Sequence, residues 1–325
     1  MKIFVVGAAG AVGKRLIPQL LASGREVIAA TRTPAKADNL RALGAQPVIL
    51  DLLDRAAVLN TVISVQPDVL VHQGTSLARV HNLKHFDDRF EMTNRLRTTG
   101  TEYLLEAARA AGTRRFIAQS YTGWPNERSG GRVKTETDPF DSNPPGSMRR
   151  SLAAIQKLEE LVLGAGNLTG IVLRYGNFYG PGTSVAPDGE IVEAVRQRKL
   201  PIIGSGAGIW SWIHIDDVVR ATLLAIEGAP AGIYNIVDDD PAEVSVWLPY
   251  LAQAIGAKPP RRVPEWLGRL VAGEAVVSMM TKIRGASNAT AKRVLNWQPL
   301  YPTWREGFVR GLNARRTVNK MMVGK

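Results

Sequence analysis

Residues 1–13 read MKIFVVGAAGAVG, a short apolar run that ends on three evenly spaced glycines. Ile3–Val6 has the unbroken apolar character of a strand that is buried on both faces. The apolar residues that follow recur at helical spacing, at Leu16, Ile17, Leu20 and Leu21. The glycines are therefore predicted to lie in a turn between a buried strand and an amphipathic helix.

The glycines follow the pattern Gly-x-x-Gly-x-x-Gly, which differs from the Gly-x-Gly-x-x-Gly of the general dinucleotide fingerprint. Glycine allows a tight turn, a close approach of the backbone to a diphosphate, and close packing of the helix on the strand. The helix N-terminus offers free N–H groups to phosphate. An ordinary flexible turn is the alternative, and a signal peptide is not expected because the glycines come too early. The predicted phosphate-binding residues are Gly7, Ala9, Gly10, Ala11, Val12 and Gly13.

The composition is that of a globular protein with one large or two unequal domains. The chain has 325 residues, 45% of them hydrophobic and 22% charged, and no apolar run long enough to span a bilayer. The absence of cysteine excludes disulfides, thiolate metal ligands and a cysteine nucleophile. The four histidines are scattered, and His81 and His85, four residues apart, lack an accompanying carboxylate motif. We expect a cytoplasmic protein with no metal and no membrane partner.

The formal net charge of +12 raises the question of nucleic acid. The basic residues are spread along the chain, and no Lys/Arg run is interleaved with aromatic residues. We therefore expect no nucleic-acid partner. The charge is instead interpreted as solvated surface that attracts an anionic cofactor or a small anionic substrate.

Strand and helix patterns alternate through the first half of the chain. The predicted strands are 3–6, 26–31, 46–51, 68–73, 114–120, 170–175 and 232–237. The predicted helices are 34–43, 54–65, 99–111 and 148–163, with Asp54 as an N-cap and an irregular loop over 124–146. Repeated βα units of this length predict an α/β fold with a doubly wound parallel sheet, which binds ligands at the carboxyl ends of its strands.

The rhythm changes after Gly180, and the late chain is rich in proline and tryptophan. We expect residues 1–180 plus about 208–238 to form the dinucleotide-binding domain. Residues 181–207 plus 239–325 are expected to form a smaller, mostly helical C-terminal subdomain that binds substrate.

Several blocks of the chain resemble motifs of the extended short-chain dehydrogenases/reductases, in the right order and nearly from end to end. The blocks are Gly7–Gly13, Asp51-Leu52, LRYGNFYGPG at 173–182, IHIDD at 213–217, Ser287-Asn288 and 304–307. The chain looks like a member of the NAD-dependent epimerase/dehydratase group of that superfamily. The resemblance implies a Rossmann fold, NAD(P) as cofactor, a small-molecule substrate and a homodimer as one assembly.

The resemblance also implies a set of cofactor contacts. Asp51 would hydrogen-bond the adenine and Leu52 would cover it, although Asp51 is equally well explained as a helix N-cap or turn residue. The remaining cofactor residues would be Gln73, Gly74, Gln119, Arg174, Tyr175, Gly176, Asn177 and Phe178. The residues nearest substrate would be Trp124, Asn177, Tyr179 and His214, the last equally well a packed structural histidine.

The end of the second predicted strand favours NADP(H) over NAD(H). Proteins that bind NAD usually offer an acid to the ribose hydroxyls there. This chain reads Ala30-Thr31-Arg32-Thr33, with no acid. Arg32 can bind a 2′-phosphate with two N–H groups, and an ordinary surface arginine is the alternative.

The chain departs from the family at the proton-transfer group. Ser120 stands where the family places its catalytic serine, but the family also requires Tyr-x-x-x-Lys on the next helix. Lys157 has Ala153 four residues before it, and none of the seven tyrosines has a lysine four residues later. The catalytic candidates are Ser120, Tyr121 and Lys157, with Tyr121 favoured over Tyr179 as a displaced proton donor and Lys157 alternatively an exposed helix lysine.

Two functions follow. The first is an atypical NAD(P)(H)-dependent oxidoreductase or nucleotide-sugar epimerase/dehydratase-like enzyme that acts on a small carbonyl, alcohol or sugar nucleotide. The second is a non-catalytic NADP(H)-binding protein that serves as a redox-sensing regulator.

Overall fold

A parallel sheet of seven strands forms the centre of the computed structural model, which describes residues 1–77 and 83–312. The strand order is β12-β7-β5-β4-β1-β2-β3, so the direction of progression reverses between β1 and β4. The strands are β1 (Lys2–Val6), β2 (Glu26–Thr31), β3 (Gln46–Ile49), β4 (Val69–His72), β5 (Arg115–Tyr121), β7 (Thr169–Tyr175) and β12 (Gly232–Ile236). This arrangement confirms the predicted doubly wound α/β fold and places its ligand crevice outside β1 and β4.

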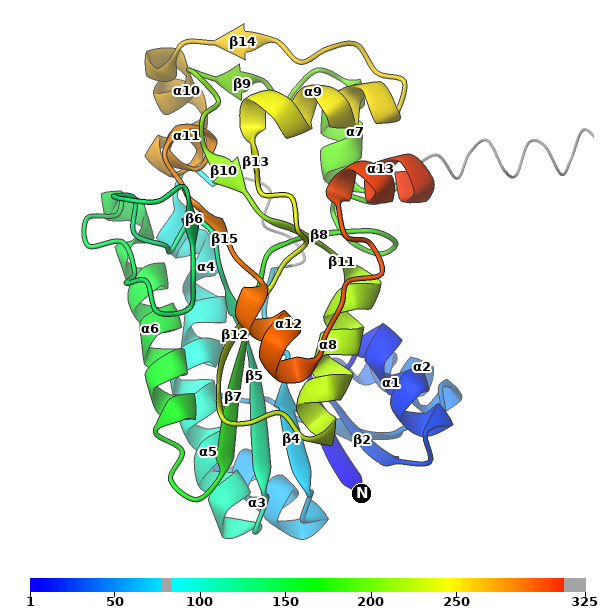
Figure 1. The fold of residues 1–325 in the computed structure, drawn as a ribbon. Coiled ribbons are helices and arrows are strands. Elements are labelled where there is room, and N and C mark those ends of the chain that lie inside the picture. Colours follow the sequence, from blue (N-terminus) through cyan, green and yellow to red (C-terminus); the bar gives the residue numbers. More distant parts are fainter. Residues whose placement is uncertain (78–82, 313–325) are drawn as a thin grey trace, which may run out of the picture.

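Helices cover both faces of the sheet (Figure 1). One face carries α1 (Gly13–Ala22), α2 (Pro34–Ala42), α8 (Ile215–Glu227) and α12 (Ala289–Leu295). The other carries α3 (Arg55–Val65), α5 (Thr101–Ala110) and α6 (Arg149–Leu163). Successive residues of β1 point to opposite faces, and Ile3 and Val5 enter one core while Phe4 and Val6 enter the other. The unbroken apolar run in the sequence reflects this double burial.

The helix predicted at 99–111 is longer than expected and is interrupted. Helix α4 (Phe86–Arg95) precedes it, and a π-helical turn, η1 (Leu96–Gly100), joins α4 to α5. Helix α4 was not predicted because polar side chains, Asp87 and Thr93 among them, occupy positions on its buried face. Its apolar period is correspondingly weak. The predicted N-cap at Asp54 is confirmed, since its carboxylate accepts a hydrogen bond from the Ala57 amide at 3.0 Å.

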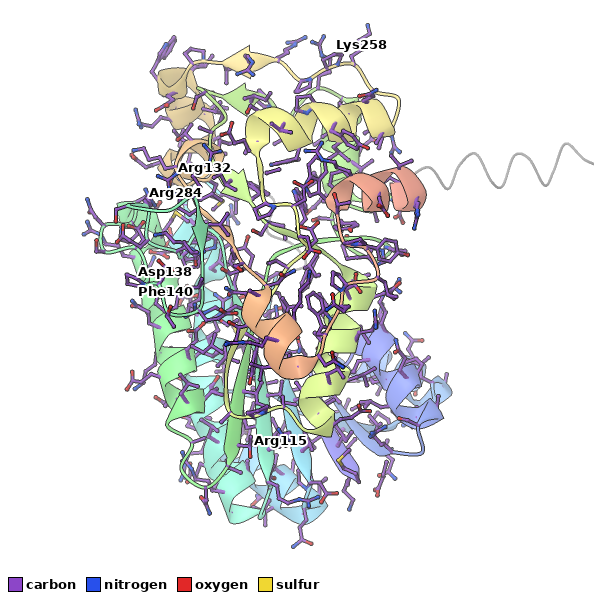
Figure 2. All side chains as sticks on the ribbon, in the orientation of Figure 1. Arg115, Arg132, Asp138, Phe140, Lys258 and Arg284 are labelled. Carbon is purple, nitrogen blue, oxygen red and sulfur yellow. The ribbon has the colours of Figure 1, made fainter. Side chains whose placement is uncertain are left out.

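The irregular segment at 124–146 is attached to the late chain by backbone pairing. Its strand β6 (Val133–Lys134) pairs with β15 (Gly285–Ala286), and a short 3₁₀ turn, η2 (Gly146–Met148), leads into α6. Figure 2 accordingly places Arg132 and Arg284 close together, with Asp138 and Phe140 on the same loop. The loop is therefore held over the carboxyl end of the sheet.

The late chain forms a group of short elements above this edge (Figure 1). The strands are β8 (Asn177–Tyr179), β9 (Ile202–Ile203), β10 (Ile209–Trp210), β11 (Trp212–His214), β13 (Ala242–Glu243) and β14 (Arg262–Val263). The helices are α7 (Glu190–Arg196), α9 (Val244–Ala254), α10 (Glu265–Ala272), α11 (Glu274–Thr281) and α13 (Trp304–Leu312). All of them except α10 contribute to an apolar cluster around Trp212, Trp247 and Phe308. The domain boundaries given above stay a prediction.

Residues 313–325 of the predicted subdomain and His81 of the histidine pair lie outside the described residues. Over residues 1–77 and 83–312, no group of three or more histidine, cysteine, aspartate or glutamate side chains is arranged to hold a metal ion. In the same part of the chain, no helix has the length and apolar character needed to cross a bilayer.

Candidate functional site

The turn after β1 brings the ends of β1 and β4 into contact. Gly7 has a φ of +75°, and a Cβ there would lie 2.4 Å from the carbonyl oxygen of Gln73. A Cβ at Gly13 would lie 2.3 Å from the carbonyl oxygen of Ala8, so α1 packs directly on the turn. Only glycine fits either position. The N-terminus of α1 therefore sits beside the point where the strand order reverses, the arrangement that binds a diphosphate.

The residues predicted to contact the adenosine half lie at the ends of β2 and β3. Arg32 is exposed, and no hydrogen bond or ion pair joins its guanidinium to the other described residues. Leu52 is buried, and its Cδ1 would lie 3.1 Å from a Cβ at Gly74. Asp51 is exposed and accepts a hydrogen bond from the Leu53 amide at 3.0 Å, as its alternative role in a turn requires. Neither role excludes the other.

Gln73 links the end of β4 to the core. Its Nε2 donates to the Tyr175 hydroxyl at 3.0 Å, and that hydroxyl lies 2.9 Å from Thr222 Oγ1. Tyr175 is therefore buried beneath the sheet edge, which differs from its expected place beside the nicotinamide. Gln73 Oε1 is buried and has no hydrogen-bond partner among the described residues. This acceptor is available to a ligand.

Ser120 and Arg174 meet at Glu159 of α6. The Ser120 hydroxyl donates to Glu159 Oε1 at 2.7 Å, and Arg174 donates to Oε1 at 2.8 Å and to Oε2 at 2.6 Å. The Arg174 guanidinium also lies 4.7 Å from the centre of the Phe140 ring, on the long loop labelled in Figure 2. All three hydrogen-bonded side chains are buried. Both side chains are thus engaged with Glu159, and the expected catalytic role of Ser120 and nicotinamide contact of Arg174 stay predictions.

The side chain of Tyr121 takes a different direction from that of Ser120. Strand β5 continues through Tyr121, and neighbouring residues of a strand point to opposite faces. The Tyr121 hydroxyl donates to Asn177 Oδ1 at 2.7 Å, and Asn177 Nδ2 donates to the Ser211 carbonyl at 3.1 Å. Burial raises the pKa of Tyr121 above its ordinary value, and the hydrogen bond to Asn177 opposes the rise. Tyr121 and Asn177 are brought together, as the predicted site requires.

An apolar cluster adjoins Tyr121 and is called here the edge cluster. It comprises Phe86, Trp124, Met148, Leu152, Ile155, Ala275, Met279 and Ile283, with Tyr121 and Phe90 packed against it. The Trp124 ring lies 6.4 Å from the Tyr121 ring and 5.2 Å, edge to face, from that of Phe86. The predicted substrate residues Trp124 and Asn177 are therefore both neighbours of Tyr121.

Two other residues predicted to contact the cofactor are Gln119, on β5, and Phe178, on β8. Gln119 is half-buried on β5 opposite Leu173, and Phe178 is half-buried with its ring 5.5 Å from that of Tyr175. A Cβ at Gly176 would lie 2.7 Å from the Ser211 carbonyl oxygen, which explains the glycine by packing.

The inner face of α6 carries no tyrosine and no lysine. Ser151 and Ile155, four residues apart, are buried on this face, and the Ser151 hydroxyl donates to Asp87 Oδ1 at 2.6 Å. Lys157 has a half-exposed side chain 3.5 Å from Glu160, so the structure corrects its expected catalytic role and favours the alternative of a helix surface lysine. Helical spacing explains the outcome, because Lys157 is two residues from the buried Ile155.

Tyr179 and His214 are packed in the interior. The Tyr179 ring lies 5.3 Å from Phe308 and 5.1 Å from His214, and only 1% of the residue is exposed. The His214 Nδ1 accepts from the Asp216 amide at 3.2 Å at the start of α8, and burial lowers the pKa of His214 to about 4. The structure favours the packed role of His214 and corrects the expected substrate contact of Tyr179.

Arg97 and Glu159 are the residues that sequence reasoning missed. Arg97 lies in η1 with 5% of its surface exposed, and burial lowers its pKa to about 10. A charged residue in a polar stretch is normally predicted to lie on the protein surface. The only signal for Glu159 is its four-residue spacing from the apolar Ile155, which places it on the same inner face.

A family model described as the NAD dependent epimerase/dehydratase family matches residues 3–237. A Streptomyces protein named 3-diazoavenalumate denitrifying reductase is 40% identical over 312 residues, which cover 95% of this chain and 100% of that protein. A Stigmatella aurantiaca ketoreductase of a farnesylated dihydroquinoline oxide is 29% identical over 79% of this chain and 74% of its own. UDP-glucose 4-epimerase from Thermotoga maritima has a TM-score of 0.76 at 24% identity, over 98% of this chain and 99% of that chain. This last likeness shows the fold.

Proposed function

Since the chain belongs to the NAD-dependent epimerase/dehydratase family, an oxidoreductase family, we propose that it is an NADPH-dependent reductase of a small aromatic molecule. The proposed acceptor carries a diazo group that is replaced by hydrogen. This proposal rests on the composition of the inner face of α6. Ser151 and Ile155 are buried there, and the helix contains no tyrosine–lysine pair.

The residues around the turn after β1 fit a dinucleotide. A side chain at Gly7 or Gly13 would fill the turn before α1, and Gln73 Oε1 is a buried acceptor without a partner among the described residues. Solved relatives of the fold bind NAD, among them dTDP-glucose 4,6-dehydratase from Streptomyces venezuelae. For this chain the exposed Arg32 at the end of β2 supports NADP(H).

Replacing Arg32 with alanine is expected to weaken NADPH binding by about 10- to 100-fold and to leave NADH binding unchanged, because a hydrogen bond to a charged group contributes about 1.5–3 kcal/mol. The measurement is titration of cofactor fluorescence. The control is Lys36→Ala, an exposed cation in the first turn of α2. Equal affinity of the unmutated protein for NADH and NADPH would contradict the preference.

The absence of a tyrosine–lysine pair from α6 matters because reduction of a carbonyl needs a proton donor and reduction of a diazonium group does not. Reduction of a carbonyl requires a proton for the developing alkoxide, which a positioned acid supplies. When bound, a reduced dinucleotide would supply the hydride for the new C–H bond, and the C–N electron pair would leave with N₂. Replacement of N₂ by hydride adds no proton, so none is needed from the protein. An inner face that carries Ser151 and Ile155 is sufficient for this chemistry.

The edge cluster supports an aromatic substrate. Trp124, Phe86 and Met148 are apolar and adjoin Tyr121, and a planar ring packs well against such side chains. A sugar is covered with hydroxyl groups, each of which would need a hydrogen-bond partner there. By its name, the Streptomyces relative also acts on a diazo compound.

Replacing Tyr121 with phenylalanine separates the two kinds of acceptor. Reduction of a diazonium is expected to keep most of its rate, because no proton is transferred, whereas any ketone reduction that uses Tyr121 as donor should fall by about 10²–10⁴-fold. The rates are measured as NADPH oxidation together with product formation. Asn177→Ala, which removes the acceptor of the Tyr121 hydrogen bond, is the matched control for positioning.

The function itself is tested by incubating NADPH and protein with an acceptor panel of 4-hydroxybenzenediazonium, simple ketones and UDP-glucose. We expect saturable formation of phenol from the diazonium. Tight NADPH binding with no turnover of any acceptor would favour the non-catalytic, redox-sensing function instead.

A further inference from the structure

Arg97 is a buried cation with an incomplete set of partners. Only 5% of the residue is exposed, and its Nη1 is buried with no hydrogen-bond partner among the described residues. Burial lowers the pKa of Arg97, and the negative charge of Glu159 opposes that effect. A guanidinium has five N–H donors, and leaving them unpaired away from water is costly.

Glu159 does not neutralise Arg97, because its carboxylate already forms an ion pair with Arg174. Both of its oxygens accept from Arg174, and Oε1 also accepts from the Ser120 hydroxyl. The Arg97 guanidinium is therefore buried without an ion-pair partner among the described residues. A buried unpaired charge destabilises a fold, and it persists where a ligand supplies the missing partner.

The backbone around Arg97 fixes its position at the carboxyl edge of the sheet. The residue lies in the π-helical turn η1, a feature that is frequent at functional sites. The Leu96 carbonyl accepts from Thr101 Oγ1 at 3.4 Å and lies 3.3 Å from His72 Nε2, at the end of β4. This contact holds η1 beside the end of β4.

Other unpaired polar atoms lie on α4, on η2 beside α4, and directly after β4. Asn94 Oδ1, one turn earlier on α4, and Ser147 Oγ, in η2, are buried and without a partner in the described part of the chain. Gln73 Oε1 is a third such atom, next to His72 in sequence. Asn94 Nδ2 donates to Ser151 Oγ at 3.0 Å, next to Leu152 of the edge cluster, so these unpaired atoms and the apolar cluster meet at α6.

We propose that Arg97 binds an anionic oxygen of the substrate, a carboxylate or phenolate on the aromatic ring that packs against the edge cluster. The proposal rests on the proposed function, because it assigns the substrate's charge at that same site. It makes Arg97 a specificity residue: an aromatic acceptor with an anionic oxygen is bound, and its neutral counterpart leaves the guanidinium unpaired.

The test is binding of benzoate and 4-nitrophenolate, with benzamide and 4-nitroanisole as neutral counterparts, to protein saturated with NADP⁺. Calorimetry is expected to give an affinity for at least one anion about 10- to 100-fold above that of its neutral counterpart. Arg97→Met should remove this difference, and Arg97→Lys should retain part of it. A preference for benzoate over benzamide identifies the bound group as a carboxylate, and a preference for 4-nitrophenolate over 4-nitroanisole identifies it as a phenolate.

Thermal unfolding separates binding from a structural role. Arg97→Met removes an unpaired buried charge and should leave the melting temperature equal or higher, whereas Arg174→Met, the matched buried arginine with two partners on Glu159, should lower it. Three results would overturn the proposal: equal binding of anions and neutral counterparts, an Arg97→Met melting temperature as low as that of Arg174→Met, or a loss of NADPH affinity in place of benzoate affinity. Binding requires no turnover, so the proposal stands or fails separately from diazo reduction.

Discussion

Replacing Arg174 with methionine is expected to lower the free energy of unfolding by about 3–5 kcal/mol, the largest effect of any single substitution considered for this protein. The substitution leaves the Glu159 carboxylate buried, with Ser120 as its remaining hydrogen-bond donor. Phe140 also loses the cation that lies over its ring. The measurement is equilibrium unfolding in urea, followed by tryptophan fluorescence.

An exposed ion pair provides the control for this prediction. Arg114 is 73% exposed and pairs with Asp68 at 2.8 Å, so Arg114→Met should cost no more than about 1 kcal/mol. The double variant Glu159→Leu/Arg174→Met should recover part of the loss, because it removes the buried carboxylate that has lost its Arg174 hydrogen bonds. A cost for Arg174→Met as small as that for Arg114→Met would show that Glu159 and Arg174 are not buried as a pair.

Replacing Gly7 with alanine is expected to abolish measurable NADPH binding and to destabilise the fold. The new Cβ would lie 2.4 Å from the Gln73 carbonyl oxygen, and this contact is with backbone, so β4 must move away from β1. The positive φ of +75° adds strain of about 1–3 kcal/mol. Both effects act at the end of the sheet where the diphosphate is proposed to bind.

Gly24 is the matched control, since it has nearly the same φ of +72° but no heavy atom within 4 Å of an added Cβ. Gly24→Ala should therefore show the cost of the dihedral angle alone and keep full NADPH affinity. The two variants are compared by thermal unfolding and by cofactor titration. Equal behaviour of Gly7→Ala and Gly24→Ala would contradict the close contact of β1 and β4 at this turn.

The sequence predicts correctly those elements that depend on a local pattern of residues. The strand over 26–31 was predicted with the bounds that the structure shows, because it is an apolar, β-branched run next to turn residues. Asp54 was predicted as a cap because a short acid before an apolar period accepts a backbone hydrogen bond. The parallel, doubly wound sheet followed from the repeated βα units.

The side-chain network at the site could not be predicted, because it joins residues that are far apart in the chain. Ser120 and Arg174 lie opposite each other on neighbouring strands, and this register depends on the packing of the whole sheet. Glu159 meets them from α6, and its neighbour Glu160 is exposed, so an adjacent pair of acids gives no sign of burial. The π-helical turn that holds Arg97 has no established sequence rule.

The central claim is that a hydride acceptor of diazo type is reduced without a proton donor on α6. The most direct test uses NADPH deuterated at C4, 4-hydroxybenzenediazonium and the unmutated protein, with mass spectrometry of the phenol and of the gas released. We expect one deuterium on the ring carbon that carried nitrogen, N₂ equal in amount to NADP⁺, and the same result with Tyr121→Phe. Phenol without deuterium, or NADPH oxidation only with ketones and only when Tyr121 is present, would contradict the claim.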